Sequence, residues 1–571
     1  MKNQFPKDTQ SLLEWKWADI EPFYQELLSL ELTAENANGW LKDWSDLTSQ
    51  VDELFSRLYI ATTQHTADPE IAQRFNSFLD SIQPLYKTFD QKLKQKLLAS
   101  RIEPAGFELP LLKMRTEASL YREANLPLFT REQKLCNRYN QIIGGITYLW
   151  EGEERTASEM SPLLQAKERG VRKQAWLTMA EGRMKHRAEI NDLWQELFKI
   201  RLQIAQNAGK ENYREYIWEQ KFRFDYTPED CKAFHRAIET AVVPAVERSN
   251  QRKQAKLGLD KIRPWDRDVD PFGGSPLKPC QSVDELKIKT RDILGQIEPD
   301  YGRYFQRMMD QDLLDLESRK NKAPGAYSLG FAVSRQPFIF MSATGTHADL
   351  ETLFHESGHA MHEFERAKLE YFQHRSENYL PAEFAEVASM GMELLMLPYL
   401  ARERGGFYEK PEASRATVKQ LEDVLSGLPY LALVDAFQHW IYENPDQGQY
   451  AALCEDKWAE LWDRFMKGID FDGYEDAKKT FWHRQLHIFI YPFYYIEYAM
   501  AQIGALQVWS NSLKNPRKGV ADYRAALALG STAGLPKLFE TAGAKFSFDT
   551  AAINPLVDLI ENTTEKLRLT M

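Results

Sequence analysis

Residues 346–365 read THADLETLFHESGHAMHEFE and contain the pattern His355-Glu356-x-x-His359. Side chains four residues apart lie on one face of a helix, one turn apart, so both imidazoles can bind the same metal ion. Glu356 lies about 100° further around the helix axis, where it can reach a metal-bound water without binding the metal. The spacing therefore predicts a helix that carries a catalytic metal centre.

The residues around this pattern favour a helix that is packed on one side. Thr346 and Asp349 have the three-residue spacing of a capping pair at a helix N-terminus. Gly358 weakens a helix but allows another element to approach closely. An apolar stripe runs beside the histidines and consists of Leu350, Phe354, Met361 and Phe364.

Three further histidines lie in or near this stretch. His362 is too far along the helix to share a metal ion with His355 and His359, so we expect it to pack against or support the site. We expect His347 and His374 at helix ends or on the surface, not among the ligands.

A catalytic zinc ion usually has three protein ligands and an open fourth position, so a further ligand is needed downstream. Residues 379–395 read YLPAEFAEVASMGMELL. Glu383, Glu386 and Glu393 fall near one helical face of this segment, at spacings of three and seven. Glu386 is the predicted ligand and Glu383 the alternative. A remaining glutamate can accept the free ring N–H of a ligating histidine.

The composition of the whole chain excludes several classes of protein. Of its 571 residues 43% are hydrophobic and 27% charged, which permits a large core and argues against intrinsic disorder. The 83 acidic residues outnumber the 72 Lys and Arg residues and give a formal net charge of -11. This charge argues against nucleic acid as a partner.

The expected location follows from the cysteines and the apolar runs. Cys136, Cys231, Cys280 and Cys454 are widely spaced and indicate reduced thiols. The N-terminus lacks the apolar stretch of a signal peptide, and no run of about 18 apolar residues suggests a membrane span. We therefore expect a cytoplasmic protein with no membrane partner.

The predicted fold class is mostly α. Residues 38–58, 71–98 and 283–306 show the three- and four-residue apolar spacing of amphipathic helices. Two strand-like runs, 326–333 and 336–342, predict a small sheet beside the helices. Prolines and glycines mark an irregular segment at 258–280 and a break at 405–411.

The segments HESGHAMHEFE and AEFAEVASMGMELL together resemble the M3 family of zinc metallopeptidases, in particular its oligoendopeptidase F branch. The resemblance extends from about residue 110 to the C-terminus. It implies one zinc ion per chain, held by His355, His359 and Glu386. The spacing between His359 and Glu386 is a few residues longer than in that branch, and Glu383 would restore the shorter spacing.

The resemblance also implies an overall shape. We expect a mostly helical, prolate, two-lobed body of the zincin type, with a deep central cleft and a small β-sheet beside the zinc helix. Residues 1–200 would form an N-terminal helical lobe and residues 201–571 the zinc peptidase catalytic domain. Such a cleft would admit flexible oligopeptides and exclude folded proteins.

Residues 483–498, HRQLHIFIYPFYYIEY, are rich in donors that can stabilise the charge developing on a scissile carbonyl oxygen. Aromatic residues more often fill cores, so a core segment is the alternative interpretation. M3 peptidases carry a histidine followed by several tyrosines here. The resemblance implies that His487 positions the substrate and that Tyr498 donates to the oxyanion, with Tyr494 as the competitor. Two tyrosines are predicted to bind substrate, Tyr491 and Tyr495.

Residues 336–342, QPFIFMS, precede the metal helix. They are a candidate edge strand along which a peptide could pair through main-chain hydrogen bonds, and a simple hairpin strand is the alternative.

These features predict a zinc-dependent endopeptidase that hydrolyses internal bonds of short oligopeptides by attack of a zinc-bound water that Glu356 activates. One alternative is a metallocarboxypeptidase with the same chemistry. Another is a helical scaffold protein with a structural zinc, although such sites usually have four protein ligands. The sequence leaves the oligomeric state open.

Overall fold

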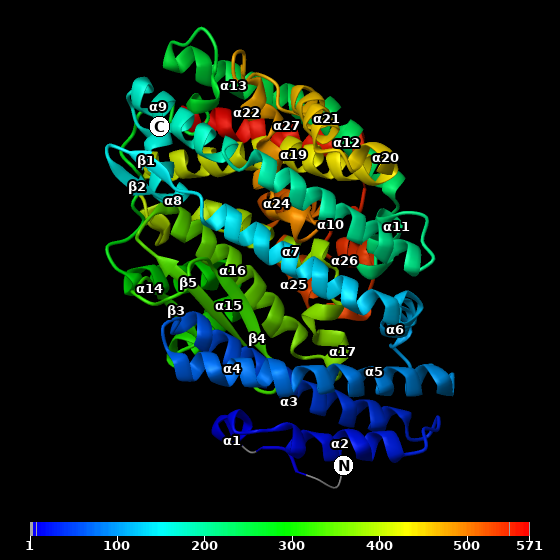
Figure 1. Ribbon diagram of the computed structural model, residues 1–571. Helices are drawn as coiled ribbons and strands as arrows, with labels where there is room; N and C mark the ends of the chain where they lie inside the picture. Colours follow the sequence, from blue (N-terminus) through cyan, green and yellow to red (C-terminus); the bar gives the residue numbers. More distant parts are fainter. Residues whose placement is uncertain (1–3, 7, 548, 570) are drawn as a thin grey trace.

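The computed structural model of the chain describes residues 4–571 apart from residues 7, 548 and 570. Helices stack in tiers along an elongated body (Figure 1). The N-terminal helices form one end, the C-terminal helix lies near the other end, and a small sheet with the metal-motif helix lies between them. The predicted mostly α fold class is confirmed.

The N-terminal half of the chain is almost entirely helical. In chain order its elements are α1 (Thr9–Leu13), α2 (Trp17–Ser29), α3 (Ala37–Gln64), α4 (Pro69–Ser81), α5 (Gln83–Ser100), α6 (Glu108–Leu120), α7 (Leu126–Gly144), β1 (Tyr148–Trp150), β2 (Glu153–Arg155), α8 (Ala157–Met160), α9 (Arg169–Met184), α10 (Arg187–Asn207), α11 (Tyr213–Gln220), α12 (Pro228–Ala237), α13 (Val243–Leu257), α14 (Val283–Ile297) and α15 (Pro299–Asp310). The elements that follow are β3 (Leu314–Glu317), β4 (Tyr327–Phe331), β5 (Gln336–Ala343), α16 (His347–Arg366), α17 (Phe372–Arg375), α18 (Ala382–Leu395), α19 (Lys410–Glu443), α20 (Pro445–Gly448), α21 (Ala451–Phe465), α22 (Glu475–Lys479), α23 (Leu486–Phe489), α24 (Tyr495–Lys514), α25 (Pro516–Leu527), α26 (Leu535–Thr541) and α27 (Thr550–Arg568).

Two of the three predicted long helices are each divided in two. Residues 38–58 lie within α3, as expected. The segment 71–98 breaks at Ile82 between α4 and α5, and the segment 283–306 breaks at Glu298 between α14 and α15. Pro84 and Pro299 lie in the first turn of the second helix of each pair. Proline lacks a main-chain donor and is favoured in the first turn of a helix, so a new helix begins there while the apolar spacing continues.

The small sheet has the strand order β3-β5-β4. β4 and β5 pair antiparallel, and β3 and β5 pair parallel. The two predicted strands are confirmed, but the expectation that residues 336–342 form an edge strand is wrong, because β3 pairs with the side of β5 that β4 leaves free. β3 has four residues, which are too few for its pattern to be recognised.

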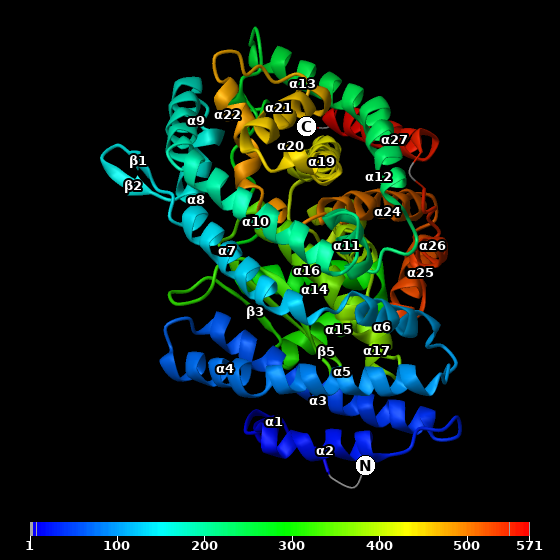
Figure 2. The ribbon, with the colours of Figure 1, turned by 45° about the vertical axis from the view of Figure 1, so that its right-hand side comes forward.

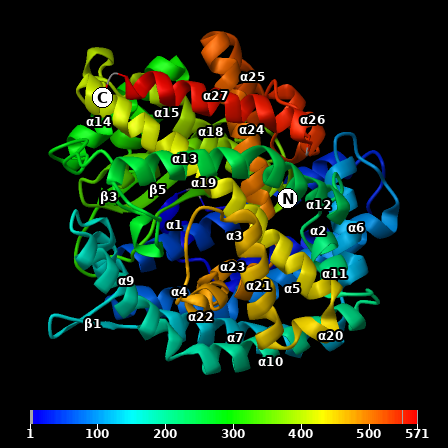
Figure 3. The same ribbon diagram turned by 90° about the horizontal axis from the view of Figure 1, so that it is seen from above.

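Two large hydrophobic cores, with two smaller clusters beside them, hold the described part of the chain together. The larger core includes residues of the sheet and of helices α7 to α27, and the smaller one lies among α1 to α6 and includes Tyr379. Figure 2 shows α3 and α5 lying across the sheet end of the larger part. Seen from above (Figure 3), α7 and α10 border one side, α25, α26 and α27 the opposite side, and α19 runs between them.

Several other predictions concern local features. Residues 258–280 contain only a 3-10 turn at Pro264–Asp266, and a glycine with φ of 78°, Gly405, lies in the break before α19. All four cysteines are free thiols. Among the described residues, no helix is long and apolar enough to cross a membrane. The predicted domain boundary at residue 200 falls within α10, and the division itself stays a prediction.

Candidate metal centre

The helix that carries the His355-Glu356-x-x-His359 pattern begins with the predicted cap. The Thr346 hydroxyl accepts from the N–H of Asp349 at 3.3 Å, and the Asp349 carboxylate accepts from the N–H of Thr346 at 2.7 Å. This reciprocal pair satisfies donors that the first turn of a helix leaves free. The start of α16 is therefore fixed locally, by a cap nine residues before His355.

A glycine brings the third-ligand helix against α16. A Cβ atom on Gly358 would lie 2.4 Å from the carbonyl oxygen of Ala388 and 2.6 Å from the Cα of Ser389. Only a residue without a side chain allows α18 to pack this closely. As a result the glutamates of α18 lie beside the histidines of α16.

The structure brings three of the predicted ligands together. The Nε2 atoms of His355 and His359 lie 3.6 and 3.7 Å from Oε2 of Glu386. Ligand atoms on tetrahedral zinc are separated by about 3.3 Å, so small side-chain movements would let all three contact one ion. Two histidines and a glutamate are also a known donor set of catalytic zinc. The residues therefore fit the metal that the motif implies.

Neighbouring side chains orient these ligands. His355 donates through Nδ1 to Oε1 of Glu393 at 2.6 Å, which leaves its Nε2 free to face Glu386. The Ser389 hydroxyl donates to Oε2 of Glu386 at 2.9 Å, and Gln420 donates to the other oxygen of Glu393 at 2.8 Å. Hydrogen bonds of this kind fix the tautomer and direction of metal ligands. Glu393 thus occupies the position expected of a remaining glutamate.

Glu383, the alternative third ligand, belongs to a different network. Its carboxylate accepts from the hydroxyl of Tyr226 at 2.5 Å and lies 4.0 Å from Nε of Arg223. The structure does not place it with the two histidines. Glu383 and Glu386 are three residues apart on α18 but point to different neighbours.

The ionisation of the site is governed by burial and by its carboxylates. Burial raises the pKa of Glu356 to about 7, and Glu386 adds to the rise while His355 opposes it. Burial alone would lower the pKa of His355, but Glu393 and then Glu386 raise it to about 9. Burial lowers the pKa of His359, which keeps that imidazole neutral. The surplus of negative charge favours a bound cation.

The predicted tyrosine cluster lies beside the proposed metal ligands. The ring of His487 lies 5.1 to 5.8 Å from four tyrosine rings, those of Tyr491, Tyr494, Tyr495 and Tyr498. Tyr494 donates to Oε1 of Glu386 at 3.4 Å, and Tyr495 donates to Gln485 at 3.0 Å. Burial and the charge of Glu386 raise the pKa of Tyr498, so its hydroxyl keeps its proton.

The supports of this cluster were missed by sequence reasoning. Phe493, directly before Tyr494, has φ of 61°, a conformation that non-glycine residues rarely adopt. Its N–H donates to Oε1 of Gln438 at 2.6 Å, and its carbonyl accepts from Arg223. Gln438 and Arg223 are far away in the sequence, and no local pattern marks them.

The other histidines of the motif region are buried. His362 packs against Phe384, with ring centroids 6.3 Å apart, as expected of a packing residue. His347 begins α16 and shares a 2.8 Å hydrogen bond with the hydroxyl of Tyr408. His374 packs against Phe107 at 4.6 Å. Both lie at helix ends, as expected, and distant aromatic residues cover them.

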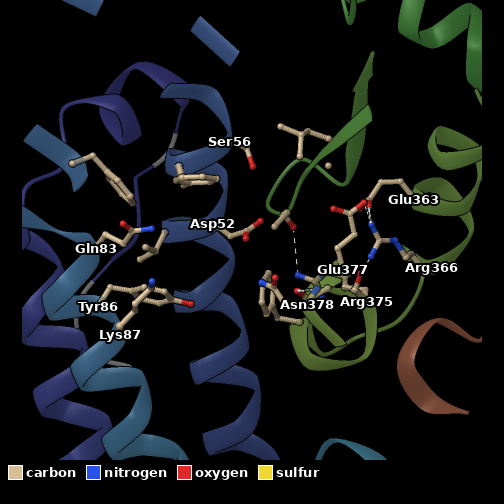
Figure 4. A pocket seen from close by; sticks show the side chains of 18 residues that line it. Asp52, Ser56, Gln83, Tyr86, Lys87, Glu363, Arg366, Arg375, Glu377 and Asn378 are labelled. Carbon is tan, nitrogen blue, oxygen red and sulfur yellow. Dashed lines mark hydrogen bonds and ion pairs between the residues drawn. The ribbon is translucent and has the colours of Figure 1, made fainter. Parts of the chain in front are cut away.

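A cavity of about 360 Å³ lies between α3 and the segment formed by β4, α16 and α17. Its lining includes Asp52, Glu363, Arg366 and Glu377, whose side chains are shown in Figure 4. Glu356 and Glu363 are seven residues apart on α16, a separation of about 10 Å along the axis. Glu363, which lines the cavity, is therefore separated from Glu356 by about the length of three residues of extended peptide.

Comparison with known proteins places the chain in a family. Residues 162–556 match the model of peptidase family M3, and residues 14–105 match the peptidase M3 N-terminal domain. The Group B oligopeptidase PepB of Streptococcus agalactiae is 22% identical over 85% of this chain and 84% of its own length. An oligoendopeptidase F homologue of Mycoplasma genitalium is 26% identical, over 43% of this chain and only 39% of its own length.

Solved structures extend the likeness over the whole chain. A PZ peptidase A with an inhibitor is 27% identical, with a TM-score of 0.84 and coverage of 99% of both chains. A putative oligoendopeptidase F is 26% identical, with a TM-score of 0.84 and coverage of 96% of both chains. The N-terminal hundred residues, where the sequence motifs were not distinctive, are included. The chain belongs to peptidase family M3 and resembles its oligoendopeptidase F members.

Proposed function

We propose that this chain is a zinc-dependent endopeptidase that hydrolyses internal bonds of short oligopeptides. The observation that carries the proposal is the convergence of His355, His359 and Glu386 beside a buried glutamate, Glu356. Membership of peptidase family M3 supports the same reaction. These observations do not favour the carboxypeptidase alternative or the scaffold alternative.

In this proposal His355, His359 and Glu386 would hold one zinc ion. Zinc in such a site acts as a Lewis acid and lowers the pKa of its water towards neutrality. Glu393 keeps the Nε2 lone pair of His355 directed at the ion. Ser389 holds Glu386 in place from the other side.

Glu356 is the proposed general base. A base works best when its pKa is near the operating pH, and burial raises that of Glu356 to about 7. It would take a proton from the attacking water and pass it to the leaving amine. Glu356 follows His355 on α16, so it lies beside the proposed metal ligands but would not bind the metal itself.

The cluster around His487 is the proposed oxyanion wall. Tyr498 is our choice of donor because its hydroxyl forms no hydrogen bond with any residue in the described part of the chain, whereas Tyr494 already donates to Glu386. Tyr491, with 54% of its surface exposed, and Tyr495 would contact the substrate. A peptide would pair with the edge strand β4, whose Leu329 and Gly330 line the neighbouring cavity.

Replacement of Glu356 by glutamine tests the proposal. The E356Q variant keeps the shape of the side chain but cannot accept a proton, so we expect a rate loss of about 10²- to 10⁴-fold with zinc content unchanged. The assay is cleavage of a quenched oligopeptide blocked at both ends, which a carboxypeptidase cannot digest. Wild-type turnover by E356Q would contradict the proposal. The predicted cytoplasmic location and the absence of nucleic-acid and membrane partners stay predictions.

A further inference from the structure

A second group of metal-ligating side chains lies in the large core, apart from the centre described above. Cys231 and His235 are four residues apart on α12, and Asp435 and His439 are four residues apart on α19. Each pair therefore lies on one face of its helix. The two helices pack against each other, which brings the pairs together.

The ligand atoms converge as closely as those of the proposed catalytic centre. One ligand atom each from Cys231, Asp435 and His439 lie within 4.8 Å of one another. Nε2 of His439 is 3.3 Å and Nε2 of His235 is 2.7 Å from Oδ2 of Asp435. The corresponding distances in the catalytic group are 3.6 and 3.7 Å. The 3.3 Å separation equals the spacing of about 3.3 Å expected between nitrogen and oxygen ligands on tetrahedral zinc.

This cluster is buried, and one carboxylate oxygen in it has no hydrogen bond among the described residues. Cys231 and Asp435 are 0% exposed, His439 is 2% and His235 is 4% exposed. Oδ2 of Asp435 faces both histidines, but Oδ1 has no hydrogen bond. Buried polar atoms are normally paired. A cation bound beside Asp435 would satisfy this oxygen.

We propose that Cys231, Asp435 and His439 bind a zinc ion inside the core, with His235 holding the Asp435 carboxylate through its hydrogen bond. Thiolate, imidazole and carboxylate groups are the ligands that zinc takes in proteins. The two positive charges of the ion would be neutralised by one thiolate and one carboxylate, so the loaded core would carry no net charge. The Cys231 thiol would release its proton to solvent on binding.

Binding would require small rearrangements. His235 can keep its 2.7 Å hydrogen bond to Oδ2 of Asp435, because Oδ1 has no hydrogen bond among the described residues and would be available to the ion. Nδ1 of His439 faces Arg214 at 3.3 Å, and arginine can only donate. Nε2 of His439 can bind a metal only if Nδ1 carries the ring proton, so Arg214 would keep its ion pair with Glu443 alone.

The site would support the wall opposite the catalytic centre. The His439 ring lies 5.3 Å from the ring of Phe493, and the adjacent Gln438 accepts the Phe493 N–H. Phe493 precedes Tyr494, so zinc between α12 and α19 would stiffen the base of the tyrosine cluster. It would take no part in the chemistry.

Metal content of the full-length protein provides the first test. After saturation with zinc and exhaustive dialysis, wild type should hold two zinc ions per chain by elemental analysis, and the His355→Ala/His359→Ala variant should hold one. One ion in wild type and none in the variant would overturn the proposal. The outcome does not depend on peptidase activity, so it is separable from the proposed function.

A spectroscopic test identifies the thiolate. Cobalt loaded into the His355→Ala/His359→Ala variant should show thiolate-to-cobalt charge-transfer absorption in the near ultraviolet, because the catalytic ligand set contains no cysteine. A further Cys231→Ser change should remove the band, and Cys454→Ser, which alters a buried thiol outside the cluster, should leave it. Absence of the band before Cys231 is changed would overturn the proposal, even if the Cys231→Ser protein does not fold.

Discussion

Tyr498 offers a hydroxyl to the proposed active site without using it elsewhere in the described structure. Replacement by phenylalanine removes this donor and little else. Loss of one oxyanion donor typically lowers kcat by about 10²- to 10³-fold, so we expect Tyr498→Phe to show such a loss with KM and zinc content nearly unchanged. Steady-state kinetics on a blocked oligopeptide measures it. Tyr495→Phe, which removes a hydroxyl bonded to Gln485, should lose much less. A wild-type kcat for Tyr498→Phe would transfer the role to Tyr494.

Asp52 should make the stability of the protein depend on pH. Burial, with repulsion from Glu363 and Glu377, raises its pKa from 3.8 to about 7. A carboxyl that holds its proton more tightly when folded contributes stability that is complete below its unfolded pKa and is lost as the pH rises through 7. Asp52→Asn should therefore increase the free energy of unfolding above pH 7. The full pKa shift sets an upper limit of about 4 kcal/mol, and solvent screening of the half-buried group makes the actual gain smaller.

Urea unfolding at about pH 5 and about pH 8 measures this effect. The gain from Asp52→Asn should be larger at the higher pH. Asp46→Asn is the matched control, because Asp46 lies on the same helix but is partly exposed and paired with Lys42. An equal gain at both pH values would show that the charge of Asp52 is not the cause.

Gly358 determines how closely two helices approach. A methyl group there would overlap the carbonyl of Ala388, which lies 2.4 Å from the Cβ position. Gly358→Ala should therefore push α18 away, displace Glu386 from the histidines and weaken zinc binding by about tenfold or more. Competition with a zinc chelator measures the affinity. Gly427→Ala is the control, since this glycine lies inside α19 with no atom within 4 Å of its Cβ position, and it should bind zinc normally.

At the scale of these elements, the sequence could predict what neighbouring residues determine. The cap at Thr346, the spacing of His355 and His359, and the need for a small residue at Gly358 all follow from positions within one helix. The role of Glu393 follows in the same way, because it shares a helix face with Glu386. These local features define the metal helix and most of the candidate ligands.

Contacts between distant segments could not be predicted in this way. Whether β5 is an edge or a central strand depends on β3, which has four residues and begins more than twenty residues earlier. The burial of His374 depends on Phe107, and the conformation of Phe493 depends on Gln438 and Arg223. The sequence of one segment does not show which distant residues will contact it in the folded protein.

On the scale of the whole molecule, the two cores meet along α3. The N–H of Phe372 donates to the Ser45 hydroxyl, Arg375 donates to the Ser49 hydroxyl, and Thr63 bonds Tyr327 at 2.5 Å. The cavity that contains Asp52 opens along this same boundary. A peptide that pairs with β4, as proposed above, would run along this boundary, which would then form one wall of the substrate path.

Glu53 is the charged residue at the centre of this boundary. It is 3% exposed, and its Oε2 accepts from the N–H groups of Val333 and Ser334 at 2.7 and 2.9 Å, while Oε1 accepts from Arg57. Glu53→Ala removes both carboxylate oxygens and leaves their donors unpaired, which costs about 1–3 kcal/mol. We expect a lower melting temperature and a higher KM, because the wall beside the substrate loosens, with kcat nearly unchanged because the metal centre is untouched. Thermal melting and steady-state kinetics measure both.

Glu35→Ala, which replaces an exposed glutamate just before α3, is the control and should change neither the melting temperature nor KM. A stability loss without any change in KM would show that the boundary holds the cores together but does not shape the substrate path.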